Sequence, residues 1–333
     1  MPGKNIVLKI LINTALGIFL IFIWLRFVNI QEVLVILGNA RPKYALFFFL
    51  FFALAGVFRG LRLKFLLKEY KVAFKDLVML NFLSQFLSFM IPIRAGEISK
   101  SVYLTSQIKV PIGKTITWVF VDRSLDLVGI LIFITFLLPF IPTSLPSNFS
   151  QIAAVILAFF FIFFVISIKS QNFFKKTMVF LSNFLIVGFI KRLFVSFTHT
   201  IIEGLAVLHR KPVDIAGFIA LTMIALTFDS LAWMSVFWTM GIDISFLKVI
   251  LGNGLEAFTF LIPAAPGYVG SAEAAGLAVW AGLLGLEANQ ASALVVFFHI
   301  ITMLALLILG LASIYTLKFD LNLVWKKVLK KGD

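Results

Sequence analysis

Two short stretches of the sequence place charged residues within ten positions after a proline that interrupts an apolar run. In the first, Pro92 and Gly96 frame Arg94 and precede Glu97 and Lys100. An arginine can hold a phosphate through two parallel hydrogen bonds, and a lysine adds a second positive charge. These residue types suit a ligand that carries a phosphate. Alternatively, the two basic residues are cytoplasmic anchors, and the glutamate only pairs with the lysine three residues later.

The second stretch has the same character. Pro263, Pro266, Gly267 and Gly270 precede Glu273, which lies in an otherwise uncharged region. One glutamate from each stretch could alternately meet a cationic group of a ligand or neutralise the arginine of the first stretch. Alternatively, this glutamate is the N-terminal carboxylate of a helix beginning near residue 271, where the helix dipole favours negative charge.

Further charged residues lie within apolar runs. Asp122 and Asp126 are four residues apart and share a helix face, and Arg123 can pair with the second aspartate. Charges at such depth face the protein interior and often mark a pathway, although a purely structural ion-pair cluster is the alternative. Asp229 is a mid-span aspartate and a candidate for proton coupling, or otherwise a hydrogen-bonded packing residue. Glu256 is a second carboxyl group in apolar surroundings.

The composition excludes a water-soluble fold. Of 333 residues, 61% are hydrophobic and 13% are charged, with a mean hydropathy of +1.08, whereas soluble domains are about half apolar and about a quarter charged. The net charge of +14 does not indicate nucleic acid, because membrane proteins collect Lys and Arg in cytoplasmic loops. We therefore predict a membrane protein that binds no nucleic acid.

Nothing in the sequence indicates a metal or a cofactor. The chain has no cysteine, which excludes disulfides, thiolate metal ligands and a cysteine nucleophile. His199, His209 and His299 form no zinc-binding motif, and we interpret each as a loop or packing residue. We predict no metal, no cofactor and no catalytic residue.

Six apolar runs reach the length of about 20 residues that crosses a bilayer as a helix. They cover residues 6–25, 44–61, 115–140, 152–168, 213–240 and 291–317. Three shorter runs, 81–93, 247–263 and 271–286, are interpreted as re-entrant segments, with full crossings as the alternative for the last two. The run 177–190 has basic flanks and is interpreted as an interfacial helix. The predicted fold class is all-α and polytopic.

The basic residues are divided unevenly between the two sides of the membrane. With the short runs treated as re-entrant, 24 of the 29 Lys and Arg fall on one side, 4 fall on the other, and Arg123 lies in a span. By the positive-inside rule, the richer side is cytoplasmic. We predict a multi-pass protein of the cytoplasmic membrane with both termini in the cytoplasm. Residues 318–333 then form a basic amphipathic tail on the anionic leaflet.

The two proline-containing runs resemble each other. Asn81 and Pro92 of the first correspond to Asn253 and Pro263 of the second, and a glycine follows each proline four residues later. The match divides a single integral membrane domain, residues 1–333, into halves of about 6–140 and 152–317. Each half would cross the membrane three times, so the second would be inverted. Inverted repeats with broken helices are typical of secondary transporters.

These motifs together resemble the lysylphosphatidylglycerol synthase transmembrane, or flippase-like, family. The resemblance covers about residues 6–317, and Lys100 and Tyr268 depart from the arginine and glycine usual in the family. About 16 residues follow the last span, so we expect no soluble aminoacyl-transferring domain and no synthase activity. The predicted translocation path comprises Asn81, Pro92, Arg94, Gly96, Glu97, Lys100, Asp122, Arg123, Asp126, Asp229, Asn253, Glu256, Pro263, Pro266, Gly267, Gly270 and Glu273.

The resemblance implies a protein that moves a polar-headed phospholipid between leaflets. Its ligands would be membrane lipids, and a separate lipid-modifying synthase would be a partner. One alternative is an integral-membrane transferase that acts on a lipid-linked substrate, with Asp122, Asp126 and Glu273 as acid, base or metal ligands. Another is a non-catalytic partner in envelope lipid synthesis. No transferase motif or histidine cluster supports the enzyme, so we predict a transporter.

Overall fold

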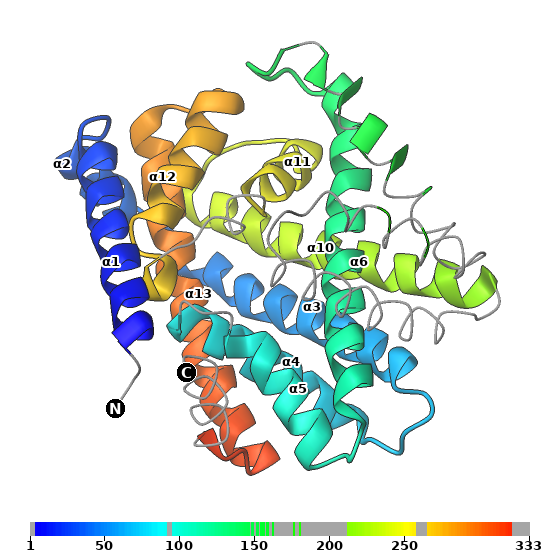
Figure 1. The fold of residues 1–333 in the computed structure, drawn as a ribbon. Helices are drawn as coiled ribbons and strands as arrows, with labels where there is room; N and C mark the ends of the chain where they lie inside the picture. The colour runs from blue at the N-terminus through cyan, green and yellow to red at the C-terminus, as the bar shows by residue number, and fades with distance from the viewer. Residues whose placement is uncertain are drawn as a thin grey trace.

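The computed structural model describes residues 4–91, 95–146, 212–257 and 265–321, with isolated positions between 148 and 180. Within these residues, every regular element is a helix (Figure 1), which confirms the predicted all-α class. Only isolated positions of the predicted span 152–168 and of the interfacial run 177–190 are described, and most of the tail 318–333 lies outside the described residues.

The first group of helices runs from the N-terminus to residue 140. It comprises α1 (Lys4–Leu25), α2 (Ile30–Gly38), α3 (Ala45–Leu66), α4 (Phe74–Met90), α5 (Ala95–Ser106) and α6 (Ile112–Leu137), with the 3-10 turns η1 (Pro42–Tyr44) and η2 (Leu138–Phe140). The second group comprises α10 (Pro212–Met240), α11 (Phe246–Ala257), α12 (Ser271–Leu277) and α13 (Ala288–Leu317). The 3-10 turn η5 (Pro266–Tyr268) precedes α12, and the π-helical turn η6 (Ala278–Leu283) follows it.

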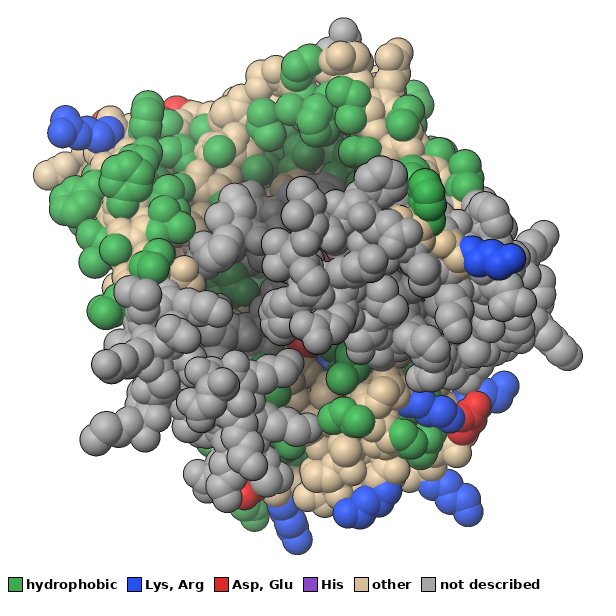
Figure 2. Space-filling view, viewed as in Figure 1, with side chains coloured by type: hydrophobic (Ala, Val, Ile, Leu, Met, Phe, Trp, Pro, Cys, Tyr) green, Lys and Arg blue, Asp and Glu red, His purple; other side chains and the backbone are tan. Residues whose placement is uncertain are grey.

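Four helices of the described part are long and apolar enough to cross a membrane. They are Pro42–Leu66, Ile112–Phe140, Ala216–Met240 and Ala288–Leu317, and α1 with α2 forms a fifth candidate bent by 88°. These five match five of the six predicted spans. Figure 2 shows hydrophobic side chains over the upper part of the molecule and most Lys and Arg side chains at its lower edge. The orientation in a membrane stays a prediction.

The run 81–93 forms one arm of a helical hairpin. Helix α4 ends at Met90, and Ile91 is extended, with φ −120° and ψ 113°, because the residue before a proline avoids the helical region. Helix α5 then packs back against α4. A Cβ atom on Gly96 would lie 2.0 Å from the Ser84 carbonyl oxygen, so only glycine permits this close packing.

The second part of the second broken segment is too short to cross alone. Helix α12 with η6 covers residues 271–283. At about 1.5 Å per residue, this piece is roughly 20 Å long, against a hydrocarbon core of about 30 Å. This length favours a re-entrant segment over a full crossing for the run 271–286. Residues outside the described ranges follow α11 directly, so the interpretation of the run 247–263 stays a prediction.

The helix contacts repeat in the two groups. Helix α3 of the first group packs against α10 of the second. Helix α4 packs against α13, and in the same way α11 packs against α6. Helix α5 packs against α6, and in the same way α12 packs against α13. Exchanging α3 with α10, α4 with α11, α5 with α12 and α6 with α13 leaves these pairs unchanged. Two related halves would pack in this way, although the division at residues 140 and 152 stays a prediction.

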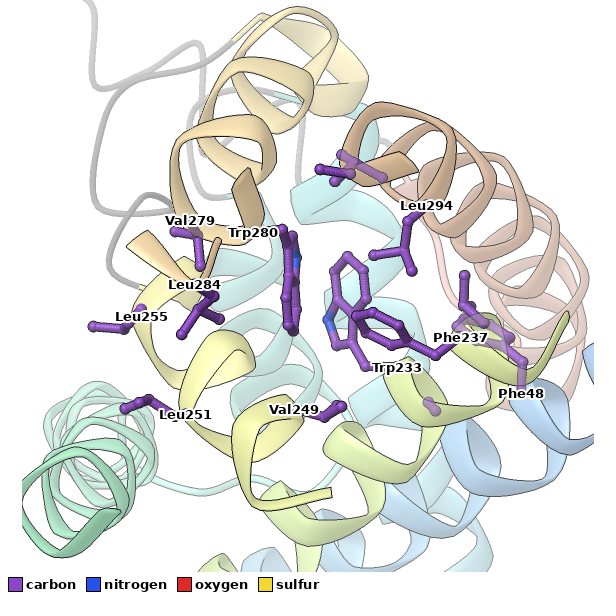
Figure 3. Packing of buried hydrophobic residues seen from close by; sticks show 14 of the residues in the cluster. Phe48, Trp233, Phe237, Val249, Leu251, Leu255, Val279, Trp280, Leu284 and Leu294 are labelled. Atoms are coloured by element: carbon purple, nitrogen blue, oxygen red, sulfur yellow. The ribbon is translucent and has the colours of Figure 1, made fainter. Parts of the chain in front are cut away.

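Two apolar clusters fill the interior. One, around Leu63, Trp118 and Phe218, joins α3, α4, α5, α6 and α10 near one end. The other lies toward the opposite end of α3 and α10, where Trp233 and Trp280 face each other with ring centroids 5.1 Å apart (Figure 3). On α3 and α10, the segment between the two clusters carries charged residues described below, whereas the charged residues of α6 begin within the first cluster, between Val121 and Leu125.

The α4–α5 hairpin generates a testable prediction. Gly96→Ala should lower the free energy of unfolding by about 1–3 kcal/mol, because the added methyl group meets backbone that cannot move aside cheaply. Thermal unfolding in detergent measures the change. Gly38→Ala is the matched control, since a Cβ atom there meets nothing within 4 Å. Equal stability of the two variants would contradict the packing described.

Candidate functional site

Arg62 lies at the centre of a buried group of charges. Its side chain is fully buried, its Nε donates to Oδ1 of Asp122 at 2.9 Å, and its Nη1 donates to Oδ1 of Asp126 at 2.7 Å. Nη1 also donates to the Thr222 hydroxyl, and Nη2 donates to the carbonyl of Asp122 and lies 2.6 Å from its Oδ1. The guanidinium of Arg62 thus donates four hydrogen bonds and lies against both aspartates.

Lys100 occupies the other side of Asp122. Its Nζ lies 3.0 Å from Oδ2 of the aspartate, and both side chains are almost fully buried. Both carboxylate oxygens of Asp122 therefore face a cation. The interpretation of Lys100 as a cytoplasmic anchor is wrong, because the helical hairpin carries this side chain into the interior.

Three further ion pairs continue toward the surface. Arg59 forms a bidentate ion pair with Asp229, in which Nη1 donates to Oδ1 at 3.0 Å and Nη2 donates to Oδ2 at 2.5 Å. Arg123 lies 3.3 Å from Glu97 and 3.8 Å from Asp126. Asp229 is therefore not an unpaired aspartate, and Glu97 pairs with Arg123 rather than with Lys100. The proposed Glu97–Lys100 pairing is wrong, because tertiary packing supplies a different partner, whereas Arg123 contacts Asp126 as its spacing predicted and Asp229 is hydrogen-bonded, as its second interpretation stated.

We call these eight side chains the charged network. Four cations balance four carboxylates, and exposure rises from 0% for Arg62 to 16% for Arg59 and 43% for Arg123. Asp122 lies ten residues after the first residue of α6, Ile112, which places it roughly 15 Å along the helix at about 1.5 Å per residue. The network comprises Arg59, Arg62, Glu97, Lys100, Asp122, Arg123, Asp126 and Asp229.

The sequence analysis missed two members of the network. It assigned Arg59 and Arg62 to a cytoplasmic loop, whereas both lie in α3 and point into the interior. The assignment failed because the positive-inside rule counts charges without distinguishing a loop from the end of a span. A signal was present: the two arginines are three residues apart, share a helix face and follow an apolar run directly.

A second polar site lies on α12 and α13. The backbone N–H of Gly270 donates to Oε2 of Glu273 at 2.7 Å, which confirms the predicted helix N-terminal carboxylate. The other oxygen, Oε1, lies 2.6 Å from Nδ1 of His299, whose Nε2 lies 2.6 Å from the Gly267 carbonyl. The interpretation of His299 as a plain packing residue is therefore wrong. No sequence spacing joins it to Glu273.

The turn before α12 brings the two broken segments together. Gly267 and Gly270 have φ of +69° and +83°, a left-handed conformation that favours glycine. Tyr268 of this turn packs against Phe89 near the end of α4, with ring centroids 6.0 Å apart. Pro266 opens the turn. The predicted convergence of the two segments is therefore present in the described part of each.

The remaining predicted residues are separate from the network or undescribed. Asn253 donates to the Ser230 hydroxyl at 3.0 Å, and Glu256 accepts from the Trp280 indole at 3.3 Å. Asn81 is buried, and its side-chain nitrogen has no hydrogen-bond partner among the described residues. Pro92, Arg94 and Pro263 lie outside the described residues. In the described ranges, no group of three or more carboxylate or histidine side chains could hold a metal ion.

Comparison with known proteins identifies the family. Residues 6–310 match the family described as the lysylphosphatidylglycerol synthase TM region. The chain belongs to this family. Over 170 residues it is also 24% identical to UPF0104 membrane protein MJ1595 of Methanocaldococcus jannaschii, covering 48% of this chain and 50% of the relative. The chain thus aligns with about half the length of that relative. Family membership links the protein to membranes and lipid metabolism.

The burial of the network predicts a large effect of removing one charge. Asp122→Asn should lower the free energy of unfolding by about 3–5 kcal/mol, because Arg62 and Lys100 lose a shared partner away from water. Unfolding in mixed micelles with increasing denaturing detergent measures the change.

The matched control is Glu69→Gln, which breaks the exposed Glu69–Lys114 pair, whose side chains are 55% and 41% exposed. This substitution should lower the free energy of unfolding by less than about 1 kcal/mol. An equally small loss in the free energy of unfolding for both variants would contradict the prediction, since the network would then stabilise the fold no more than this surface pair does.

Proposed function

We propose that the protein is a flippase-like transporter that moves a polar-headed phospholipid between the leaflets of the cytoplasmic membrane. The observation that carries the proposal is the charged network, which is balanced in charge and becomes steadily more exposed from Arg62 to Arg123. A lipid headgroup needs such a polar route through hydrocarbon, while its acyl chains stay in the bilayer.

The outer part of the network suits exchange with a phosphate. Arg123 is the most exposed cation, and its contacts with Glu97 and Asp126, at 3.3 and 3.8 Å, are longer than those of Arg62. A headgroup phosphate can compete with these carboxylates for the guanidinium, because arginine binds phosphate through two parallel hydrogen bonds, as it binds a carboxylate. The carboxylate that it displaces is then free to meet a cationic part of the headgroup.

Arg59 offers a second place for the headgroup. It is 16% exposed and holds Asp229 through both guanidinium branches. Transfer of the phosphate from Arg123 to Arg59 would carry it from α6 to the interface of α3 with α10. Arg94, which the sequence places just before α5, adds a further phosphate ligand to this path.

The arrangement of the network supports transport more than group transfer. Both oxygens of Asp122 face cations, and Oδ1 of Asp126 faces Arg62. A general base or a metal ligand needs a free oxygen, so a lipid transferase has less support. A separate lipid-modifying synthase would supply the lipid to be moved, and membrane lipids would be the direct ligands.

Transport by the reconstituted protein tests the proposal. With fluorescent phospholipids in proteoliposomes and a membrane-impermeant quencher, the wild type should move lipid between leaflets. Arg123→Gln should slow this at least tenfold, because a neutral amide cannot hold the phosphate, and Arg123→Lys should retain part of the rate. Lys114→Gln, an exposed charge outside the network, is the control.

Mass spectrometry of the same lipids separates the alternatives. A transporter leaves the lipid chemically unchanged, so a new lipid species would support the transferase instead. Chemically unchanged lipid that the wild type does not redistribute would overturn the transport proposal.

The orientation with both termini in the cytoplasm has its own test. Because the chain has no cysteine, single cysteines can be placed at exposed positions such as Lys43 and Lys71. In intact cells, a membrane-impermeant maleimide should label Lys43→Cys but not Lys71→Cys, since the charge count places them outside and inside respectively. The reverse pattern would contradict the orientation.

A further inference from the structure

The ring of His299 is held at both nitrogens. Nε2 lies 2.6 Å from the carbonyl oxygen of Gly267, and Nδ1 lies 2.6 Å from Oε1 of Glu273. The histidine and glutamate side chains are each 13% exposed, so both are largely, but not completely, removed from water. We call them the histidine–glutamate pair.

The geometry sets the number of protons in the pair. A carbonyl oxygen only accepts hydrogen bonds, so Nε2 carries a hydrogen. The contact between Nδ1 and Oε1 needs one further proton, which makes either an imidazolium with a carboxylate or a neutral imidazole with a carboxylic acid. Both forms are neutral overall. Loss of that proton leaves two lone pairs facing each other and one uncompensated negative charge.

We propose that the histidine–glutamate pair is a proton-binding site and that the proton is the coupling ion of transport. The first part stands on the geometry of His299 and Glu273, and the second part rests on the proposed function. The site binds one proton between Nδ1 and Oε1 and releases it to water through the exposed edge of the pair.

The groups that the described residues place around the pair are aromatic, backbone or acidic. Helix α4 presents Phe89, whose ring centroid is 5.6 Å from that of His299, and α1 presents Gly17 beside the turn at Gly270. From α11, Glu256 is the carboxyl group on which the charge of Glu273 acts. Among the described residues, no Lys or Arg contact with the pair is present.

This distinguishes the pair from the charged network. The carboxylates of the network face arginine or lysine, and arginine stays protonated at any physiological pH. Histidine is the side chain whose ordinary titration falls between about pH 5 and about pH 8. The histidine–glutamate pair is therefore suited to respond to a proton gradient, whereas the charged network holds permanent charges that suit a phosphate.

Proton release would act on the point where the two broken segments meet. His299 holds the turn through the Gly267 carbonyl, and Glu273 holds it through the Gly270 N–H. Repulsion within a deprotonated pair loosens this clamp, and Phe89 of α4 packs on both His299 and the neighbouring Tyr268. The protonation state is thus linked to the contact between η5 and α4.

Solution NMR tests the proton site directly, because the chain has only three histidines. In nitrogen-15 histidine-labelled protein, His299→Gln assigns the signal of His299 by its loss. We expect Nδ1 of the wild type to change protonation between about pH 5 and about pH 9 while Nε2 keeps its hydrogen. Glu273→Gln should lower the proton affinity of His299 at least tenfold, since an amide does not stabilise the imidazolium charge.

Glu287→Gln is the matched control, because it removes a carboxylate that caps the same helix α13 without contacting His299. Its His299 titration should equal that of the wild type. A wild-type His299 signal that never changes over this pH range would overturn the proton site, and it needs no variant to fold. A titration of His299 that is the same in Glu273→Gln as in the wild type would also overturn the proton site.

Transport in proteoliposomes tests the coupling separately. An imposed proton gradient should change the wild-type rate of lipid movement severalfold, and whatever movement His299→Gln retains should not respond to the gradient. Lipid movement that ignores the gradient in the wild type would overturn the coupling. A wild type that moves no lipid while His299 titrates as expected would instead overturn the proposed function and leave the proton site standing.

Discussion

The buried guanidinium of Arg62 is the constraint on which the arrangement of the helices depends. An ion removed from water needs its partners in place, because losing one leaves an uncompensated charge. Arg62 of α3 finds its partners on α6 and α10, and Lys100 of α5 shares one of them. Four helices must therefore meet around this guanidinium, where the first apolar cluster packs, and the second cluster lies beyond it on α3, α6 and α10.

The charged network and the histidine–glutamate pair divide the chemistry of the protein. The network combines permanent charges with graded exposure, which suits a headgroup that arrives at Arg123 and moves inward. The pair carries one exchangeable proton at the turn that joins the two broken segments. On these two proposals, one fold holds a charge-balanced path and a separate titratable pair, linked through α4 and the turn η5.

Proline and glycine account for the broken segments, and their effects are local. Pro92 forces Ile91 out of the helix, and the glycines of the second break adopt left-handed conformations. These breaks were predictable because they depend on backbone geometry within a few residues. The same holds for the long apolar helices and for Glu273 as a helix N-terminal carboxylate, which depends only on its distance from Ser271.

The sequence by itself determined the all-α membrane fold, five of the described spans, the positions of the breaks and the family. It also singled out six of the eight residues of the charged network. Only the tertiary structure decided how they pair. Each pair joins residues of two different helices. Arg59 and Asp229 are 170 residues apart in the sequence, and Glu273 and His299 are 26 residues apart, so no helical spacing predicts either contact. A charge pairs with the nearest opposite charge in space, and helix packing sets that distance.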